Sequence, residues 1–545
     1  MSHQASDIEK QKQFNPKIKT MTTRREFLSK GSLSLLGLAA VPALLNQCTS
    51  SDTGTNPDMF SFPRVSPESQ GISSQAIIDF IKAADNSKLE WHSFKILRHG
   101  NILAEGHWSP FKEEYKHTLY SLSKSFTSTA IGFAVKEGLI SVEDQVISFF
   151  PNDLPVDVDD NLKSMKIKHL LTMNSGHETD TMGSMRSNED QSWVASFLSH
   201  PLVFKPGTHF LYNTGATYVL GAIIHSKTGQ TLSEFLKARF FDKLEIDGGD
   251  WEVSPQGLNT AGYGLRVKTE DIAKLGQFYL QNGTWKGEEL LTTEWVTEAT
   301  KKQTESQEND SDWGQGYGYQ FWRCKPEPDF YRGDGAFGQY CIVIPQYDMT
   351  IAITSESWDM GKSMQVIWDT VLPAVKTGVL AENESLSKEL KVLYSKLAIE
   401  TPAWHGTSPI SSEVNERTYM AETNDYGVNS ITFDIAEGQG EILFDTVDGK
   451  NKLLFGIEKW LTNDIYALNN FPVAGRIHVP SLIAATATWV DDNTLQINRK
   501  FVESIHGDSL ICVFEDAKIT IEFNNSVSQN SDKGVEARIP LRGLA

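Results

Sequence analysis

The sequence predicts a mixed α/β region followed by a separate, smaller β region. Between residues 62 and 375, segments typical of helices alternate with short apolar segments typical of strands. From about Leu380 the sequence pattern changes. Short stretches in which apolar and polar residues alternate are joined by turns rich in Asp, Asn and Gly. A chain of 545 residues is also too long for one ordinary core. We therefore divide it into residues 1–58, 59–379 and 380–545.

Composition excludes two classes of protein. The formal net charge is -20, although the first fifty residues hold seven Lys/Arg against three Asp/Glu and so carry about +4. The remaining body, at about -24, repels phosphates, which argues against a nucleic-acid partner. Hydrophobic residues make up 39% of the chain and mean hydropathy is -0.32, values that suit a globular protein and not a polytopic membrane protein.

The N-terminal region predicts export. Residues 1–20 are polar and lysine-rich, and we interpret them as a disordered extension. The pattern Arg24-Arg25-x-Phe27-Leu28 before the apolar stretch 31–45 resembles a twin-arginine signal. The apolar stretch is short for a membrane span. The alternative is an ordinary amphipathic N-terminus.

Cys48 is a candidate for lipid attachment. Leu45, three residues before it, resembles the start of a lipobox, whereas Gln47 occupies a position where a small residue is usual. The polar tract 49–58 suits a tether behind such an anchor. We expect a protein of the bacterial periplasm or a membrane-anchored lipoprotein, with an unmodified Cys48 as the alternative.

The expected elements follow from periodicity and from turn residues. The expected helices cover Ile77–Ala84, Ser121–Glu137, a stretch that begins after Tyr212 and runs to about Lys227, Asp271–Asn282, Thr293–Lys301 and a linking helix Leu386–Ala398. Expected strands of the first region include Ser93–Leu97, Ile102–Gly106, Cys341–Pro345 and Met349–Ser355. Those of the antiparallel second region include Ser430–Ile435, Glu441–Phe444, Ala485–Val490, Thr494–Ile497 and Lys518–Phe523.

The stretch that organises the chain contains Ser121-x-x-Lys124, placed at the start of a buried helix. One helical turn separates the two residues, so the serine hydroxyl and the lysine amine can meet. A serine hydroxyl needs a neighbouring base to act as a nucleophile, and a lysine in an apolar pocket can supply one. The helix N-terminus offers N–H groups for an oxyanion. The simpler alternative is a capped helix with a solvated lysine.

Tyr212 stands in a loop ahead of another helix. It can relay protons if neighbouring cations lower its pKa. The alternative is a packing tyrosine whose hydroxyl reaches a backbone carbonyl.

Several patterns argue against other chemistries. Gly333-x-Gly335-x-x-Gly338 matches a dinucleotide fingerprint, but a strand follows where that motif needs a helix. The Lys-Thr-Gly triplet that ends at Gly229 is interpreted as a helix stop. No C-x-x-C, H-E-x-x-H or complete G-x-S-x-G occurs, and we expect neither a metal nor a cofactor. Cys324 and Cys341 are expected as separate buried thiols, with a disulfide as the alternative.

Three motifs, in order and at suitable separations, resemble those of serine β-lactamase-like hydrolases. The branch is the one that contains class C β-lactamases, D-alanyl-D-alanine carboxypeptidases and related esterases. The motifs are Ser121-x-x-Lys124, Tyr212-x-Thr214 and Gly333-Asp334-Gly335, and the similarity spans about residues 62–375. Flanking stretches that also look like the family are Leu170–Gly176, Lys205–Gly207 and Asp271–Gln277.

The resemblance implies a fold and a set of roles. It implies an α/β sandwich, with an antiparallel sheet, helices on its faces and a helical subdomain that bears Ser121. Ser121 then resembles the acylated nucleophile, Lys124 the residue that takes its proton and Tyr212 the second acid/base. The oxyanion hole is implied to be formed by the N–H groups of Ser121 and Ala336. Which of Lys124 and Tyr212 is the acylation base stays open.

The third and second motifs depart from the family pattern. Gly333 stands where Lys or His is usual, and such a cation often meets a substrate carboxylate. Arg332 is adjacent, but on a strand its side chain should point to the other face. In the second motif the Asn usually found two places after the tyrosine is replaced by Thr214, and Asn213 comes one place earlier. Recognition of a penicillin or D-Ala carboxylate is therefore not expected from this segment.

We expect an exported serine hydrolase that acts on a small ester or amide through an acyl-Ser121 intermediate. The substrate-binding residues we expect are Gly333, Asp334, Gly335, Ala336, Asn213 and Thr214. One alternative is a D-amino-acid carboxypeptidase or β-lactamase, and another is a catalytically silent binding protein. The β region shows no catalytic constellation in its sequence.

Overall fold

The computed structural model describes residues 60–188, 191–401, 408–466, 481–530 and 536–545. The expected signal, the tether and Cys48 lie outside the described residues. Residues from Met59 to Ala545 form one compact unit. In the part of the chain so described, no helix is both long enough and apolar enough to span a membrane.

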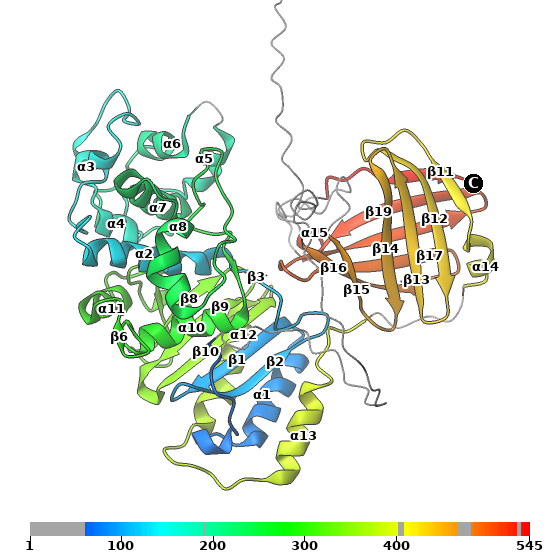
Figure 1. Ribbon diagram of the computed structural model, residues 1–545. Coiled ribbons are helices and arrows are strands. Elements are labelled where there is room, and N and C mark those ends of the chain that lie inside the picture. The colour runs from blue at the N-terminus through cyan, green and yellow to red at the C-terminus, as the bar shows by residue number, and fades with distance from the viewer. Residues whose placement is uncertain (1–59, 189–190, 402–407, 467–480, 531–535) are drawn as a thin grey trace, which may run out of the picture. The chain divides into compact units, whose positions relative to one another are not determined.

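The first region is built on an antiparallel sheet with helices on both faces (Figure 1). The strand order, among the described residues, is β2-β1-β10-β9-β8-β7. The strands are β1 Glu90–Arg98, β2 Asn101–His107, β7 Trp322–Arg323, β8 Tyr331–Gly335, β9 Gln339–Ile344 and β10 Met349–Glu356. Alternation along β9 and β10 sends successive side chains into two different cores, which is why these strands read as continuous apolar runs.

Two helical layers fill those cores. One face of the sheet packs against α1 Ser74–Asn86, α12 Met360–Thr370 and α13 Glu384–Tyr394. The other face packs against α10 Thr269–Leu280 and, beyond it, the buried helix α2 Ser123–Lys136. The expected linking helix thus begins and ends earlier than predicted, and its Leu390 belongs to the core beneath the sheet.

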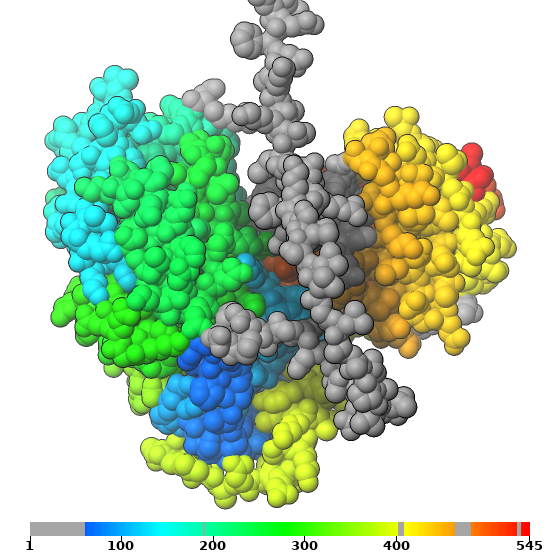
Figure 2. Space-filling view, in the orientation of Figure 1, coloured from blue at the N-terminus to red at the C-terminus, as the bar shows by residue number. Residues whose placement is uncertain are grey.

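A helical subdomain surrounds α2 and α7 Thr214–Thr228 and shares one continuous core with the sheet. In the space-filling view its residues, from cyan to green, merge into one surface (Figure 2). Its other helices are α3 Asp160–Ser164, α4 Ile167–Leu171, α5 Met182–Ser187, α6 Trp193–Ser199, α8 Leu232–Leu236, α9 Asp242–Leu244 and α11 Thr293–Thr300. Short strand pairs are β3 His117–Thr118 with β4 Arg266–Val267, and β5 Thr284–Trp285 with β6 Glu288–Glu289.

Helix ends follow the sequence signals. Gly229 adopts a left-handed backbone with φ of 71° and caps α7, which confirms that the Lys-Thr-Gly triplet is a helix stop. β9, and not a helix, follows the glycine-rich Gly333–Gly338 segment, so the dinucleotide pattern is a coincidence. Cys324, Cys341 and Cys512 are buried free thiols, as expected for the first two.

The second region is a β-barrel. Among the described residues, nine strands close in the order β14-β13-β12-β11-β20-β19-β18-β17-β16, and β14 pairs with β16 to complete the circle. That closing pair is parallel, which differs from the purely antiparallel domain expected, because the chain reaches β16 only after the extra strand β15. Packed aromatic and aliphatic side chains fill the interior. The strands are β11 Thr418–Ala421, β12 Val428–Ala436, β13 Gln439–Thr446, β14 Gly449–Ile457, β15 Leu461–Tyr466, β16 Leu482–Trp489, β17 Thr494–Phe501, β18 Gly507–Glu515, β19 Lys518–Asn525 and β20 Leu541–Leu544.

Candidate active site

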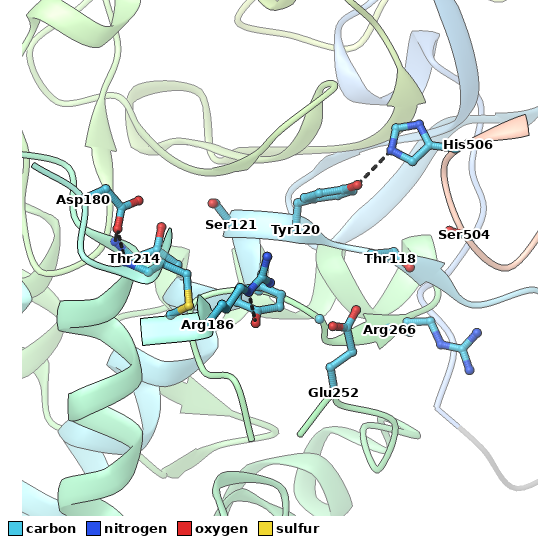
Figure 3. A pocket seen from close by; sticks show the side chains of 13 residues that line it. Thr118, Tyr120, Ser121, Asp180, Arg186, Thr214, Glu252, Arg266, Ser504 and His506 are labelled. Atoms are coloured by element: carbon cyan, nitrogen blue, oxygen red, sulfur yellow. Dashed lines mark hydrogen bonds between the residues drawn. The ribbon is translucent and has the colours of Figure 1, made fainter. Parts of the chain in front are cut away.

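Ser121 lies in a tight turn at the entrance to the buried helix α2. A single 3₁₀ turn, Tyr120–Leu122, leads into the helix, so the helix begins slightly later than predicted. Tyr120 has a positive φ of 47°, an uncommon conformation for a residue with a side chain. Ser121 is partly exposed and lines a cavity of about 270 Å³ (Figure 3). The turn therefore presents the serine hydroxyl to solvent at the end of a rigid element.

Lys124 lies one turn further and is only 1% exposed. Its Nζ is 3.0 Å from Ser121 Oγ and donates to the Gly262 carbonyl at 2.8 Å. Burial lowers the pKa of Lys124 to about 7, against the attraction of the Asp180 and Asp334 carboxylates. A large fraction of this amine is therefore neutral at neutral pH, and its lone pair can accept the Ser121 proton.

Tyr212 completes a group of three polar side chains. Its ring stacks on Trp322 at 5.4 Å between centroids, and the Lys124 Nζ lies 4.9 Å from the ring centre. Desolvation by these neighbours raises the pKa of Tyr212 far above its usual value, and the Asp334 carboxylate adds to the rise, while a hydrogen bond with Ser121 acts in the opposite direction. The condition set for a proton relay through Tyr212, a pKa lowered by neighbouring cations, is therefore not met. The phenol keeps its proton and serves as a donor.

The third-motif strand β8 runs directly beside the Ser121 turn. A Cβ on Gly335 would lie 2.1 Å from the Leu119 carbonyl oxygen, and one on Gly333 would lie 2.5 Å from Leu122 Cδ1 and from Ser125 Oγ. Neither position can carry a side chain without movement. Close approach of the Leu119 backbone therefore explains Gly335, and packing of the Leu122 and Ser125 side chains explains Gly333. The same approach places Ala336, the next residue after the strand, near the turn that carries Ser121.

Asp334 forms a buried ion pair with Arg332. The Arg332 Nε donates to Asp334 Oδ2 at 3.0 Å, and Trp313 Nε1 donates to the same oxygen at 3.1 Å. As expected from strand alternation, Arg332 lies away from the Gly333 face, and its Nη1 donates to the carbonyls of Asp312 and Arg323. Arg332 therefore does not replace the missing cation of the third motif.

The two residues after Tyr212 differ in position. Asn213 is fully buried, where its side chain accepts from the Gly215 N–H and from the Thr181 hydroxyl as the N-cap of α7. Its side chain caps a helix and is not among the groups that line the cavity. Thr214 does line it, and the Thr214 N–H donates to Asp180 Oδ1 at 3.0 Å.

Several residues that line the cavity were not predicted as site residues from the sequence. Its lining includes the acid Asp180 and the base Arg186, which donates to the Tyr263 hydroxyl at 3.2 Å. It also includes Ser504 and His506 from the barrel, more than 380 residues after Ser121 (Figure 3). No motif marked these barrel residues, because only the closed tertiary structure brings their loop to the site.

Among the described residues, one cluster of acidic side chains has a spacing that could bind a metal ion. The carboxylates of Glu105, Glu113 and Glu270 lie within 4.8 Å of one another. Lys95 and Arg64 lie among them, with Lys95 Nζ 3.1 Å from Glu113 and Arg64 Nη2 2.6 Å from Glu270. These cations already neutralise the acids, so the cluster is explained as an ion-pair network.

Comparison with known proteins identifies the family. The family model described as "Beta-lactamase" matches residues 92–376. This chain belongs to the β-lactamase family. The family assignment confirms the resemblance and the fold class predicted from the three motifs, and it makes the chain a β-lactamase-family hydrolase.

Relatives of this β-lactamase-family chain carry several names. A 6-aminohexanoate-dimer hydrolase of Paenarthrobacter ureafaciens is 26% identical over 288 residues, which cover 49% of this chain and 72% of that protein. A lovastatin esterase of Penicillium rubens is 30% identical over 151 residues, covering 24% and 37%. Among solved structures, an octameric penicillin-binding protein homologue from Pyrococcus abyssi matches 86% of this chain and 99% of its own, with 16% identity and a TM-score of 0.45.

Proposed function

We propose that this protein is a serine hydrolase that cleaves a small ester or amide by two-step acyl transfer to water. The observation that carries the proposal is the 3.0 Å approach of the buried Lys124 amine to the partly exposed Ser121 hydroxyl. A buried amine with a pKa near 7 is suited to activating a serine at neutral pH.

In the acylation step, the Lys124 amine takes the Ser121 proton as Oγ bonds to the substrate carbonyl carbon. The carbonyl oxygen becomes an oxyanion that accepts hydrogen bonds from the N–H groups of Ser121 and Ala336. One such donor contributes roughly 3–4 kcal/mol to the transition state. As the bond to the leaving group breaks, Tyr212 gives that group its proton and regains one from the Lys124 ammonium.

In the deacylation step, a water molecule attacks the acyl-Ser121 carbonyl. Lys124, neutral again, accepts a proton from that water, and collapse of the second tetrahedral intermediate returns a proton to Ser121 Oγ. The acid product leaves and the enzyme is restored. We assign the base role to Lys124 because Tyr212, with its raised pKa, holds its proton at neutral pH.

The negative charges in the site favour a substrate that has no carboxylate beside the scissile bond. Gly333 supplies no cation. The carboxylates of Asp180 and Asp334 lie close enough to Lys124 to favour its charged form, although burial lowers its pKa overall. An anionic substrate group in this place would be repelled. The names of the relatives include a dimer hydrolase and an esterase, which agree with this substrate class.

A D-amino-acid carboxypeptidase or β-lactamase is the second candidate, favoured by Arg186. This guanidinium lines the cavity and can face a substrate carboxylate. If a fluorescent penicillin labels wild-type protein but neither Ser121→Ala nor Arg186→Ala, the second candidate replaces the first. A catalytically silent binding protein is the third alternative.

The decisive experiment is intact-protein mass spectrometry after treatment with a fluorophosphonate, paired with a panel of neutral esters, amides and β-lactams. We expect one adduct on wild type, none on Ser121→Ala, and turnover of a neutral ester that only wild type shows. Ser123→Ala is the matched control. Ser123 lies two residues after Ser121, and its Oγ accepts a hydrogen bond from the Leu265 N–H. An unmodified wild-type protein would favour the binding protein.

We also propose export with lipid attachment at Cys48, on the strength of Arg24-Arg25 and the apolar stretch 31–45. Cell fractionation tests it: wild type is expected with membranes, and Cys48→Ala is expected in the soluble periplasmic fraction. Equal distribution of the two proteins would contradict lipid attachment, and retention of both in the cytoplasm would contradict export.

A further inference from the structure

Two backbone positions beside the proposed oxyanion hole are strained. Tyr120, with φ of 47°, immediately precedes Ser121, and Phe337, with φ of 66°, immediately follows Ala336. Left-handed backbone is unfavourable for a residue with a side chain, so it persists where the surroundings impose it. Contacts of Tyr120 and Phe337 must therefore hold the two turns, which carry the proposed donor N–H groups.

One side chain contacts both strained residues, and it comes from the barrel. The Tyr120 hydroxyl lies 2.8 Å from His506 Nε2 (Figure 3). The Phe337 ring meets the same imidazole edge-to-face, with 4.7 Å between centroids and 87° between planes. The Tyr120 and Phe337 rings also contact each other at 5.4 Å. Edge-to-face ring pairs of this kind are a favourable arrangement.

The imidazole is itself fixed. His506 is 5% exposed, and its Nδ1 lies 2.8 Å from Oε1 of Glu356, which ends strand β10. Since a carboxylate can only accept, Nδ1 carries a proton, and in the neutral imidazole Nε2 then accepts from the Tyr120 hydroxyl. Ser526 Oγ lies 3.4 Å from Nδ1, and Lys500 Nζ lies 3.3 Å from Glu356 Oε2. The orientation and tautomer of the ring are thus set by a buried network.

We propose that His506 is a positioning residue that holds the oxyanion hole in its working geometry. It fixes Tyr120 through a hydrogen bond and Phe337 through ring contact, and each of these residues adjoins one of the two donors. The inference rests on the proposed function, since it concerns the same acyl-transfer step. The barrel thereby becomes part of the catalytic machinery of a site whose motifs all lie in the first region.

A role in the oxyanion hole predicts an effect on the transition state and not on substrate binding. The N–H groups form their strongest bonds to the oxyanion, so a shift of a few tenths of an ångström lowers kcat and leaves KM nearly unchanged. A boronic acid, which forms a tetrahedral adduct with the serine, reports on the same donors without turnover.

The test compares His506→Ala, His506→Gln and Tyr120→Phe with wild type on a neutral ester. We expect His506→Ala to lower kcat roughly 10–100-fold and to weaken boronic acid inhibition by a similar factor, with KM changed less than threefold. Gln can donate to Glu356 and accept from Tyr120, so His506→Gln should recover part of the loss. Tyr120→Phe, which removes only the hydroxyl, should lower kcat severalfold.

Tyr426→Phe is the matched control. It removes a phenol whose hydrogen bond, to the Ile539 carbonyl, lies within the barrel, and its kcat should equal that of wild type. If Tyr120→Phe and His506→Gln match wild type in kcat and in boronic acid affinity, the inference is overturned even where His506→Ala does not fold. If wild type itself forms no adduct with the fluorophosphonate or boronic acid, the proposed function fails instead.

Discussion

At the residue scale, Lys124 shows how burial changes the chemistry of a side chain. The residue is 1% exposed, and among the described residues its amine contacts a carbonyl and a hydroxyl but no carboxylate. Asp180 and Asp334 act on it only through space. A direct ion pair would have kept the lysine charged, and the apolar enclosure therefore makes it a base.

The activity of the enzyme should therefore depend on pH near neutrality. Because the base must be neutral to act, kcat/KM for a neutral ester should fall tenfold per unit below about pH 7, the value to which burial lowers the pKa of Lys124. Measurement of kcat/KM between pH 5 and 9 checks this. An acid limb that begins near pH 9 would mean that Lys124 is charged at neutrality and is not the base.

The same burial should cost stability. Between the folded pKa of about 7 and the ordinary value near 10.4, unfolding binds a proton, so native stability rises with pH across this window and the full cost applies below pH 7. Lys124→Met should therefore be more stable than wild type at pH 6, by on the order of 2–4 kcal/mol after loss of the bond to Gly262.

Thermal unfolding at pH 6 and pH 9.5 measures that difference. The advantage of Lys124→Met should shrink at the higher pH, whereas Lys388→Met, which changes a lysine side chain that is 79% exposed, should show no such trend. An equal gain at both pH values would assign the effect to packing and not to the charge.

At the scale of elements, the site depends on how closely β8 approaches the Ser121 turn. Gly335 allows contact with the Leu119 backbone, and Gly333 allows contact with the first turn of α2. The family places a cation at the position of Gly333, but here α2 occupies the space that its side chain would need. With Gly333 in the third motif, strand β8 packs directly against the first turn of α2.

Gly335→Ala should separate these elements. The added Cβ would lie 2.1 Å from the Leu119 oxygen, so the end of β8 and the Ala336 N–H must move away from Ser121. We expect kcat to fall roughly 100-fold, comparable to loss of one oxyanion donor. Gly378→Ala, at a site with no atom within 4 Å of the new Cβ, should retain full activity. Full activity of Gly335→Ala would exclude this geometry.

At the scale of the whole molecule, a partly buried ion network joins the sheet to the barrel. Lys500 of β17 lies 2.6 Å from Glu90 at the start of β1 and 3.3 Å from Glu356 at the end of β10. Burial alone would lower the pKa of Lys500, but these two carboxylates hold it above its usual value. The same Glu356 orients His506, so the network connects the barrel to the active site.

Removal of the central cation should destabilise the protein. Lys500→Met leaves Glu356 buried and Glu90 half-buried without their shared cation, and we expect a loss of up to roughly 3 kcal/mol in the free energy of unfolding. Denaturant unfolding measures it, with Lys450→Met, an exposed barrel lysine, as the control. If both variants unfold like wild type, the network contributes nothing to stability.

The sequence by itself determined the features that are local or periodic. Ser121 and Lys124 share a helix face because they are one turn apart, and strand alternation placed Arg332 away from Gly333. Gly229 ends its helix as predicted. Pairing within the barrel was also partly predicted, because period-two segments and turn residues act over a few positions.

The tertiary structure alone decided the features that depend on burial and on distant contacts. Charge and desolvation at Tyr212 come from Trp322 and Asp334, more than a hundred residues away, so the local sequence could not give the direction in which its pKa shifts. The Asn213 side chain, which caps α7, also accepts a hydrogen bond from the Thr181 hydroxyl, 32 positions away in the sequence. His506 reached the Ser121 turn because the barrel closed, and no local pattern encodes a contact across 386 positions.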